Sequence, residues 1–352
     1  MKIAFLSFYS GEVYRGVETF VHELGNRLIK MGHEVTIYQN GPKVPGAKYK
    51  TVSIGIKINL NKFNSYISFF NYYGRKVGLF TLKVLKRIDK DTDILFPTNG
   101  QWQALLGSIW GKTHKAKVVI SGQSGPGLDD RINLWTFPDR FVALTSHQKD
   151  WAKKANPFVK VEKIPNGVDL KKFNDRVRPI SLDLPRPIIL SVAALDFWKR
   201  LDLPIKAVSR LNGASLLLVG KGPQEEKLKR LGEKLLPGRF KIMSFPHAQM
   251  PGVYRAADIF TYPTVSWESF GIVLVEAMAS GLAVVANKDD IRREIVGRAG
   301  VLVDPTNIDA YSIALENALR LRWGKRPQNQ AKKFDWDKIA DKYEKLFQRL
   351  LE

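Results

Sequence analysis

Short apolar segments alternate with amphipathic segments of helical length along almost the whole chain. The first such unit has an apolar strand at residues 2–8, a turn containing Gly11 and Gly16, an amphipathic helix at 17–30 and a second strand at 34–39. Strand, glycine-containing turn, helix and strand in this order form the repeating unit of a parallel α/β sheet. Because such sheets bind ligands at the carboxyl ends of their strands, the turns that follow the strands are the first places to look for functional residues.

A second α/β unit begins at residue 188, after a segment at 171–187 that contains three prolines and mixed charge and is typical of an interdomain linker. The chain of 352 residues is too long for one ordinary core. We therefore expect two domains, residues 1–176 and 177–334, followed by a last helical segment at 335–352. Two such halves form a cleft, where ligands usually bind.

The expected strands and helices share the same pattern, a short apolar run or a longer amphipathic one bounded by turn residues. Further strands are expected at residues 94–97, 118–121, 140–144, 161–164, 188–193, 215–219, 239–245, 258–262, 282–286 and 300–303, and further helices at 203–211, 224–236, 271–279, 307–321 and 336–350.

Two carboxylates, Glu268 and Glu276, flank the start of the short helix at 271–279. Phe270 and Gly271 precede its apolar positions, and Gly281 stands where a helix C-cap would. If Glu268 lies in the loop and Glu276 lies more than one turn inside the helix, both can face a ligand held over the helix N-terminus. That terminus has unpaired N–H groups and a partial positive charge, which suit a diphosphate.

Carboxylates do not bind phosphate, so here they would serve another part of the ligand. Each can accept hydrogen bonds from two neighbouring hydroxyls, as a sugar or a ribose offers, which indicates a sugar nucleotide. In the alternative, Glu268 only favours the helix start electrostatically and Glu276 is an ordinary solvated helix residue. The spacing alone leaves both interpretations open.

Basic residues and glycines follow other strands of the two units. Lys199 and Arg200 come after one strand of the second unit, and Gly220 and Lys221 come directly after the next. Any of these cations could neutralise a leaving diphosphate, or they are surface residues, which composition favours for Lys221. Gly16 could let the backbone approach a phosphate or an acceptor, or it only shapes its turn.

The net charge of +22 implies attraction to an anionic partner. Lysines and arginines are spread along both halves with no RRM, KH or zinc-finger signature, so we expect no specific nucleic-acid binding. Residues 60–88 combine aromatic and basic side chains, which suits a helix in an anionic membrane interface. We favour the other reading, a helix packed on the sheet with its lysines in water. The chain has no cysteine and no paired histidines, so we expect no metal site.

Several motifs together resemble the retaining glycosyltransferases of family 4, the glycosyl transferases group 1. They are Pro165-Asn-Gly-Val-Asp169, Val219-Gly-Lys-Gly-Pro223, the segment from Glu268 to Gly281, and Gly300-Val-Leu-Val-Asp-Pro305. Gly16 to Leu24 is similar to the first helix of that family, so the resemblance covers nearly the whole chain. The family has the GT-B fold, in which two Rossmann-like α/β domains with parallel sheets face each other across a cleft.

The resemblance implies transfer of a sugar from a nucleoside diphosphate sugar, a UDP- or GDP-sugar above all, to a hydroxyl of a saccharide or lipid-linked acceptor. It implies retention at the anomeric carbon, no bound metal and no cofactor besides the co-substrate. The C-terminal half would hold the donor and the N-terminal half the acceptor, and residues 335–352 would cross back to the N-terminal domain. We expect a cytoplasmic protein that can contact the anionic inner membrane surface.

The resemblance also implies residue roles. Glu268 would touch the hydroxyls of the donor sugar, Glu276 the ribose hydroxyls and Lys199 the diphosphate, while Phe270 and Gly271 would offer backbone N–H groups. The expected catalytic residues are Glu268, Lys199 and Gln123, and the expected donor-binding residues are Glu276, Ser269, Phe270, Gly271, Ile272, Gly16, Arg200, Gly220 and Lys221.

Two positions depart from the family pattern. Ala193-Ala194 stand where the family usually has a Gly-Arg pair, and Gly122-Gln123 stand where many members have a histidine. A glutamine can hydrogen-bond a sugar but cannot act as a base at neutral pH. Retention without an evident nucleophile then points to attack from the face that the diphosphate leaves, with the diphosphate taking the proton of the acceptor. A GT-B sugar-nucleotide epimerase or hydrolase, and a non-catalytic basic protein that binds anions or nucleic acid, are the alternatives.

Overall fold

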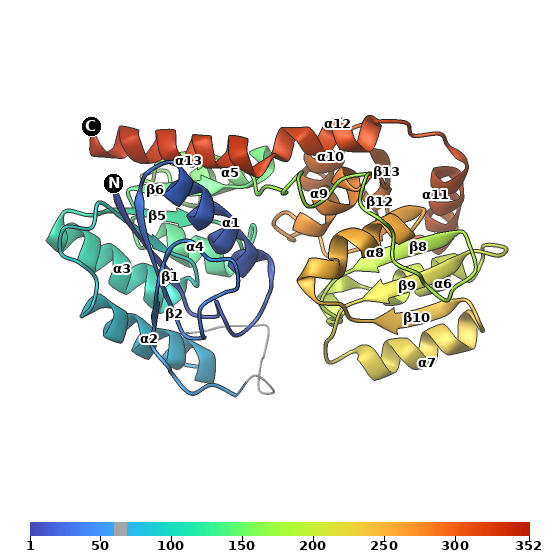
Figure 1. The fold of residues 1–352 in the computed structure, drawn as a ribbon, viewed down its shortest axis with the longest axis horizontal. Coiled ribbons are helices and arrows are strands. Elements are labelled where there is room, and N and C mark those ends of the chain that lie inside the picture. The colour runs from blue at the N-terminus through green and yellow to red at the C-terminus, as the bar shows by residue number, and fades with distance from the viewer. Residues whose placement is uncertain (60–68) are drawn as a thin grey trace. The chain divides into compact units, whose positions relative to one another are not determined.

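The computed structural model describes residues 1–59 and 69–352, which form two compact units (Figure 1). Unit 1 comprises Met1–Asn166 and Trp336–Glu352, and unit 2 comprises Gly167–Asp335. The first crossing between units therefore lies ten residues before the expected boundary after residue 176 (176 − 166 = 10). Residues 171–187, which we expected to be an interdomain linker, belong instead to unit 2, where the N–H of Ile180 donates to the carbonyl of Gly252 at 3.2 Å.

Unit 1 is built on a seven-stranded sheet in the order β3-β2-β1-β4-β5-β6-β7, and neighbouring strands are parallel. The strands are β1 Lys2–Ser7, β2 Glu34–Gln39, β3 Lys50–Ser53, β4 Ile94–Pro97, β5 Lys117–Ser121, β6 Arg140–Ala143 and β7 Val161–Lys163. The helices are α1 Gly16–Lys30, α2 Tyr72–Leu85, α3 Gln101–His114, α4 Leu128–Leu134, α5 Ser146–Ala155 and α13 Trp336–Leu351.

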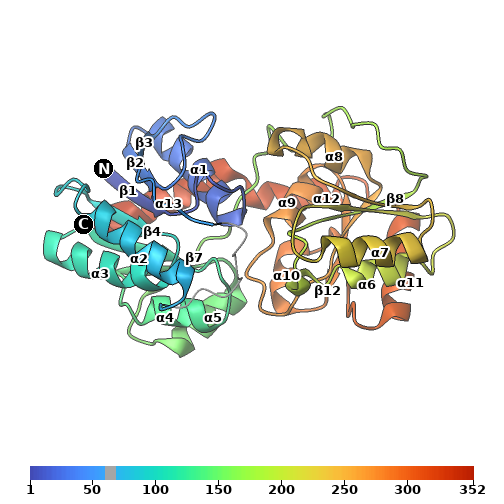
Figure 2. The ribbon, with the colours of Figure 1, turned by 90° about the horizontal axis from the view of Figure 1, so that it is seen from below.

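The last helix, α13, is part of the core of unit 1. Its Trp336 and Tyr343 are buried against Phe20 of α1, with ring centroids 5.9 Å and 5.7 Å apart. At the rim, Arg27 Nε donates to the Asp337 carboxylate at 2.7 Å. Figure 2 shows α13 and α1 side by side over one face of the sheet, while α2 and α3 cover the other.

Helix α2 packs on the sheet and also exposes apolar side chains. Tyr73, Val77, Phe80 and Val84 are buried, as expected for a helix packed on the sheet. Its outer face carries the exposed apolar residues Tyr72, Leu79 and Leu82 together with the exposed basic residues Arg75 and Lys83. Residues 60–68, the first part of the aromatic and basic stretch, lie outside the described residues. Within the described residues, no helix combines the length and the apolar character needed to cross a bilayer.

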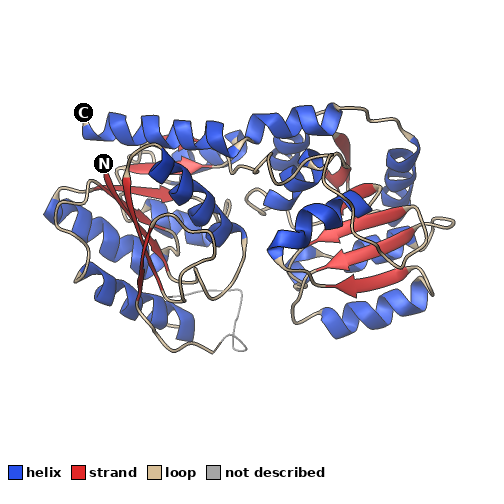
Figure 3. Cartoon of the chain, in the orientation of Figure 1, coloured by secondary structure: helices blue, strands red, loops and turns tan. Residues whose placement is uncertain are grey.

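Unit 2 is built on a six-stranded parallel sheet in the order β10-β9-β8-β11-β12-β13, with helices on both faces (Figure 3). The strands are β8 Ile188–Val192, β9 Ser215–Val219, β10 Phe240–Met243, β11 Ile259–Tyr262, β12 Ala283–Asn287 and β13 Gly300–Val303. The helices are α6 Asp202–Val208, α7 Glu225–Leu235, α8 Met250–Ala256, α9 Ile272–Ala279, α10 Asp290–Val296, α11 Ile308–Arg320 and α12 Arg326–Ala331, with short 3-10 turns at Phe197–Lys199, His247–Gln249 and Lys332–Phe334.

Candidate active site

An ion pair stands at the carboxyl edge of the sheet of unit 2. Lys199 ends the 3-10 turn that follows β8, and Glu268 lies in the loop that follows β11. Strands β8 and β11 are neighbours, so their carboxyl ends bring these two side chains together. Lys199 Nζ contacts a Glu268 carboxylate oxygen and donates to the Tyr262 hydroxyl at 3.1 Å. Their side chains are 21% and 19% exposed, so both are shielded and still reachable by a ligand.

Mutual attraction keeps the side chains of Lys199 and Glu268 charged. Burial by itself would raise the pKa of the Glu268 carboxyl, but Lys199 and, to a lesser extent, Arg292 bring that pKa below its ordinary value. Burial would likewise lower the pKa of Lys199, but Tyr262 and Glu268 together raise that pKa above its ordinary value. A full positive and a full negative charge therefore stand side by side at neutral pH.

A buried arginine holds the loop that carries Glu268. Arg292 of α10 is completely buried, and its guanidinium donates to the backbone carbonyls of Glu268, Ser266 and Val265 at 2.8 Å, 3.2 Å and 3.3 Å. Its charge is paired with Asp289 at 2.6 Å. The sequence analysis missed Arg292. The only local signal is that Asp289 is the N-cap of α10 and accepts from the N–H of Arg292, and this does not reveal that the side chain turns inward.

The start of α9 lies in the same loop. Gly271 has a φ of +82°, and a Cβ there would lie 2.9 Å from the Tyr262 ring, so glycine is required both for its conformation and for its size. The Phe270 side chain is buried against Phe334, with ring centroids 5.7 Å apart, so only its backbone can meet a ligand. Ser269 is also buried, and Ile272 is the first residue of the helix. The first N–H groups of an α-helix have no partner inside the helix.

Glu276 lies in the second turn of α9 and is not a solvated helix residue, so that alternative is wrong. Its side chain is 8% exposed and accepts a hydrogen bond from the buried Tyr254 hydroxyl at 2.7 Å. The Tyr254 ring contacts Phe260, which stacks on Tyr262, with centroids 5.8 Å and 6.4 Å apart. A buried aromatic row thus runs from the partner of Glu276 to the tyrosine beside Lys199.

The loops after β8 and β9 pack against each other. Gly220 has a φ of +156°, and a Cβ there would collide with the carbonyl oxygen of Ala193. The N–H of Leu195 donates to the carbonyl of Lys221 at 3.0 Å, whereas the Lys221 side chain is exposed. Arg200 follows Lys199 in the left-handed conformation, with a φ of +49°. The site residues expected in the second unit therefore lie in the loops after the neighbouring strands β9, β8 and β11, and in the first two turns of α9.

The remaining two expected site residues lie in unit 1. Gly16 is the exposed first residue of α1. Gln123 follows β5, and its amide exchanges hydrogen bonds with the Asn166 amide at 3.1 Å and 3.0 Å and donates to Ser121 at 2.9 Å. A Cβ at Gly122 would lie 2.5 Å from the Gln148 amide nitrogen and 2.6 Å from the Phe141 ring, so a side chain at position 122 would need this packing to move.

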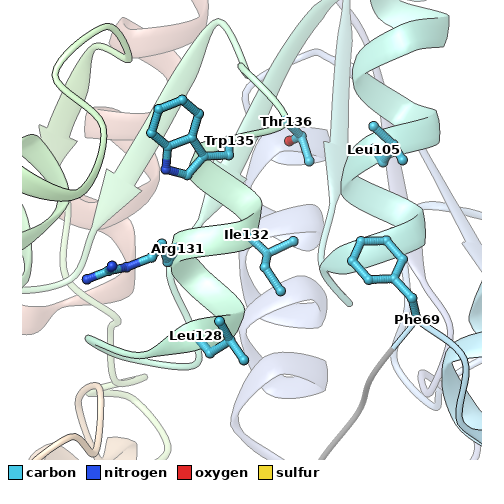
Figure 4. A pocket seen from close by; sticks show the side chains of 7 residues that line it. All are labelled: Phe69, Leu105, Leu128, Arg131, Ile132, Trp135 and Thr136. Carbon is cyan, nitrogen blue, oxygen red and sulfur yellow. The ribbon is translucent and has the colours of Figure 1, made fainter.

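Unit 1 also contains an apolar pocket between α3 and α4, with a volume of about 370 Å³. Figure 4 shows the side chains of Leu105, Ile132 and Phe69 around this space. Its complete lining is Phe69, Leu105, Leu128, Arg131, Ile132, Trp135 and Thr136. Across residues 1–59 and 69–352, no three His, Asp or Glu side chains are grouped so that they could hold a metal ion.

Two family models match the chain, one for each half. Residues 14–172 match Glycosyltransferase Family 4, and residues 174–335 match Glycosyl transferases group 1. The phosphatidyl-myo-inositol mannosyltransferase of Mycobacterium tuberculosis is 31% identical, over 99% of this chain and 97% of that protein. Its counterpart from Mycolicibacterium smegmatis is 28% identical, over 99% and 94%.

Solved structures show the same fold at low sequence identity. The sucrose-phosphate synthase of Thermosynechococcus elongatus has a TM-score of 0.79 at 19% identity, covering 99% of this chain and 98% of that one. Anabaena HepE in complex with UDP and glucose has a TM-score of 0.78 at 18% identity, covering 99% of each chain. With both halves matched and a full-length relative above 30% identity, this chain belongs to the glycosyl transferases group 1 and is a glycosyltransferase with the GT-B fold.

Proposed function

We propose that this glycosyltransferase is retaining and independent of metal ions, and that it moves a sugar from a UDP- or GDP-sugar to a hydroxyl of a lipid-linked acceptor. The observation that carries the proposal is the shielded Lys199–Glu268 ion pair beside the N-terminus of α9. A carboxylate that accepts from sugar hydroxyls, a cation for phosphate and a helix N-terminus are together the parts that a nucleoside diphosphate sugar requires.

The same groups can stabilise the departing diphosphate. In the proposed reaction the bond from the anomeric carbon to the acceptor oxygen forms as the bond to the diphosphate breaks on the same face, and a diphosphate oxygen takes the acceptor's proton. Negative charge grows on the diphosphate, and we propose that Lys199 and the first N–H groups of α9 stabilise it there. Fixed positive groups of this kind do the work that Mg²⁺ does in other enzymes, which is why we propose no metal and no cofactor besides the co-substrate.

Other residues take supporting parts in the proposal. Glu276 accepts from the ribose hydroxyls, and Tyr254 orients it through the 2.7 Å hydrogen bond. Gln123, fixed by Asn166 and Ser121, hydrogen-bonds a sugar hydroxyl without acting as a base. Arg200, Lys221 and the backbone at Gly16 and Gly220 provide further contacts for the donor phosphates.

A lipid-linked acceptor is favoured over a free saccharide by three observations. The relatives that match along 99% of this chain are phosphatidyl-myo-inositol mannosyltransferases, which are named for a lipid. In unit 1, the outer face of α2 combines exposed Tyr72, Leu79 and Leu82 with exposed basic residues, as a peripheral contact with an anionic membrane would require. The apolar pocket between α3 and α4 offers space for an acyl or polyprenyl chain.

The first test is a transfer assay with UDP-glucose, UDP-N-acetylglucosamine, GDP-mannose and ADP-glucose against phosphatidylinositol, polyprenyl phosphate and free saccharides, with and without EDTA. GDP-mannose is the first donor to try, because a Mycolicibacterium smegmatis relative, 29% identical over 52% of this chain, is named as GDP-mannose-dependent. We expect an EDTA-insensitive product whose anomeric configuration, read by NMR, matches that of the donor. An inverted product or loss of turnover in EDTA contradicts the proposal.

The alternatives predict different outcomes in the same assay. A GT-B epimerase or hydrolase would consume the donor at an undiminished rate without acceptor. A non-catalytic basic protein would produce no transfer and no donor consumption, and its anion binding would fall steeply with salt.

Membrane contact has a separate test with a matched control. We expect vesicles containing anionic lipid to retain the chain in a salt-sensitive way, and Leu79→Ser with Leu82→Ser to reduce that retention. Leu321→Ser changes a leucine of unit 2 that is as exposed as Leu82, 52% against 51%, and should leave retention unchanged. If vesicle retention falls equally in the α2 double variant and in Leu321→Ser, or falls in neither, a role for the outer face of α2 is contradicted.

A further inference from the structure

Three aromatic side chains gather beside the Lys199–Glu268 ion pair. Phe197 and Trp198 occupy the 3-10 turn that ends at Lys199, and Trp267 directly precedes Glu268. The rings of Phe197 and Trp198 have centroids 3.8 Å apart, and Trp198 meets Trp267 edge to face at 5.7 Å with an interplanar angle of 73°. Although they touch one another, Phe197 is 54% exposed and Trp267 is 48% exposed.

This aromatic wall, composed of Phe197, Trp198 and Trp267, is held in position on both sides. Arg292 donates to the carbonyls of Ser266 and Glu268, the two neighbours of Trp267 in the chain. In the other loop, the N–H of Lys199 donates to the carbonyl of Asp196 at 3.0 Å, which closes the turn under Phe197 and Trp198. Large rings kept exposed on anchored backbone lose little conformational freedom when a ligand covers them, as a preorganised binding surface requires.

The neighbours of the wall define the chemistry of its ligand. A carboxylate and an ammonium lie one residue from Trp267 and Trp198, so the ligand must offer polar groups at its rim and an apolar face to the rings. A pyranose has this character, with hydroxyls around its edge and C–H bonds on its faces. Contact with a bilayer would instead bury the ion pair without a polar partner, which is costly.

We propose that the aromatic wall stacks against a pyranose ring while Glu268 accepts hydrogen bonds from the hydroxyls of a sugar in the same site. The ring belongs either to the transferred sugar of the donor or to a sugar of the acceptor. The inference rests on the proposed function, because it takes Glu268 to face the donor sugar, and it adds a subsite that the ion pair and the α9 N-terminus do not provide.

The experiment compares Trp267→Ala with the conservative Trp267→Phe and with wild type, by calorimetric titration and by steady-state kinetics. Titrations use the nucleotide sugar that the wild type turns over and the matching nucleoside diphosphate without its sugar. If the wall holds the donor sugar, Trp267→Ala weakens nucleotide-sugar binding roughly tenfold and leaves nucleoside diphosphate binding unchanged. If it holds an acceptor sugar, donor binding is unchanged and the KM for the acceptor rises by about the same factor. In both cases Trp267→Phe retains most of the binding.

Two outcomes overturn the inference. In the first, Trp267→Ala has the same donor affinity and the same acceptor KM as the wild type. In the second, Trp267→Ala loses as much affinity for the sugar-free nucleoside diphosphate as for the nucleotide sugar, which would assign the wall to the base or the phosphates. Phe158→Ala, which removes an exposed aromatic ring of unit 1, is the control and should behave as wild type. If the wild type binds no nucleotide sugar, the proposed function itself is contradicted. If the wild type is active and Trp267→Ala changes neither donor affinity nor acceptor KM, only the role of the aromatic wall is contradicted.

Discussion

The two units place different chemistry at the same edge of the same kind of sheet. In unit 2 the carboxyl ends of the strands carry full charges in pairs, Lys199 with Glu268 and Arg292 with Asp289. In unit 1 the corresponding residues are mostly amides. Gln123 pairs with Asn166 after β5, and Gln148 donates to the carbonyl of Gly122 at 2.7 Å.

The carboxyl group in the polar cluster of unit 1, that of Asp130, differs from Glu268 of unit 2 in the direction of its pKa shift. Asp130 is buried and accepts from the Gly125 N–H and the Gln148 amide, each at 3.0 Å, and from Asn133 at 3.3 Å. Burial still raises the pKa of the Asp130 carboxyl to about 7. A charged edge suits a diphosphate, and a nearly neutral edge suits a hydroxyl-bearing acceptor. The two units therefore differ in the side chains at their strand ends, which form charged pairs in unit 2 and are mostly amides in unit 1.

The largest expected effect comes from removing the buried charge that holds the loop of unit 2. Arg292→Ala leaves three backbone carbonyls without their donor and Asp289 without its partner, so we expect the free energy of unfolding to fall by about 3–5 kcal/mol. Arg293→Ala breaks an exposed pair with Asp290 and should cost less than about 1 kcal/mol. Urea denaturation compares the two, and similar midpoints would mean that the buried arginine does not anchor the loop.

The buried Asp130 carboxyl should make the stability of the protein depend on pH. Burial raises the pKa of Asp130 from 3.8 to about 7 in the folded state, so its contribution to stability is fully present below pH 3.8 and is lost progressively as the pH rises towards 7. A shift of three pKa units limits this loss to about 4 kcal/mol. Asp130→Asn should therefore flatten the fall in melting temperature between about pH 4 and pH 7. The exposed Asp150→Asn is the control, and an unchanged pH profile in Asp130→Asn would refute the assignment.

Removal of the positive charge of Lys199 should slow the transfer reaction. Lys199→Ala deletes the cation that we propose to contact the diphosphate, so we expect turnover to fall roughly 10²-fold or more. Lys206→Ala, on α6 with its partner Asp202, removes an exposed lysine of the same unit and should not change turnover. Turnover of Lys199→Ala within about threefold of wild type, measured at saturating donor, would count against this role.

The smallest effect is expected from Glu276, whose loss should weaken donor binding more than it slows the reaction. Glu276→Ala should weaken donor binding by roughly tenfold, the scale of one hydrogen-bonded contact to a charged group, and change turnover less. Tyr254→Phe removes the hydroxyl that donates to Glu276 but leaves the carboxylate, so most of the affinity should remain. A calorimetric titration in which Glu276→Ala binds the donor as wild type does would exclude contact with the ribose.

Much of the fold was predictable because apolar runs mark buried parallel strands. Strands β2, β4, β9 and β13 have the predicted bounds, whereas β3 was missed. The residues of β3 are exposed or half-buried on a sheet edge, so no apolar run marks them. Residues 171–187, which we expected to be an interdomain linker, belong to unit 2, and the two family models meet inside this segment, at residues 172 and 174.

The site was predictable only in part. The carboxylates were visible because they flank a glycine-marked helix start, and Lys199 was visible because it follows a strand. That Lys199 and Glu268 meet depends on β8 lying beside β11, a pairing of strands that are distant in sequence. Arg292 resembles any other arginine of a basic chain until the fold buries it. The amide cluster of unit 1 depends on β5, β6 and β7 being neighbours in the sheet.

The central claim is that the charged edge of unit 2 binds a nucleoside diphosphate sugar, and a thermal-shift panel of UDP-, GDP- and ADP-sugars tests it most directly. We predict that one nucleotide class stabilises the wild type by about 2.7 kcal/mol at roughly 100 times its dissociation constant. The Lys199→Ala and Glu276→Ala variants should need more of that ligand for the same shift, and Lys206→Ala should not. A wild type whose melting temperature is unmoved by every nucleotide sugar, or shifts that are identical in all variants, would contradict the account.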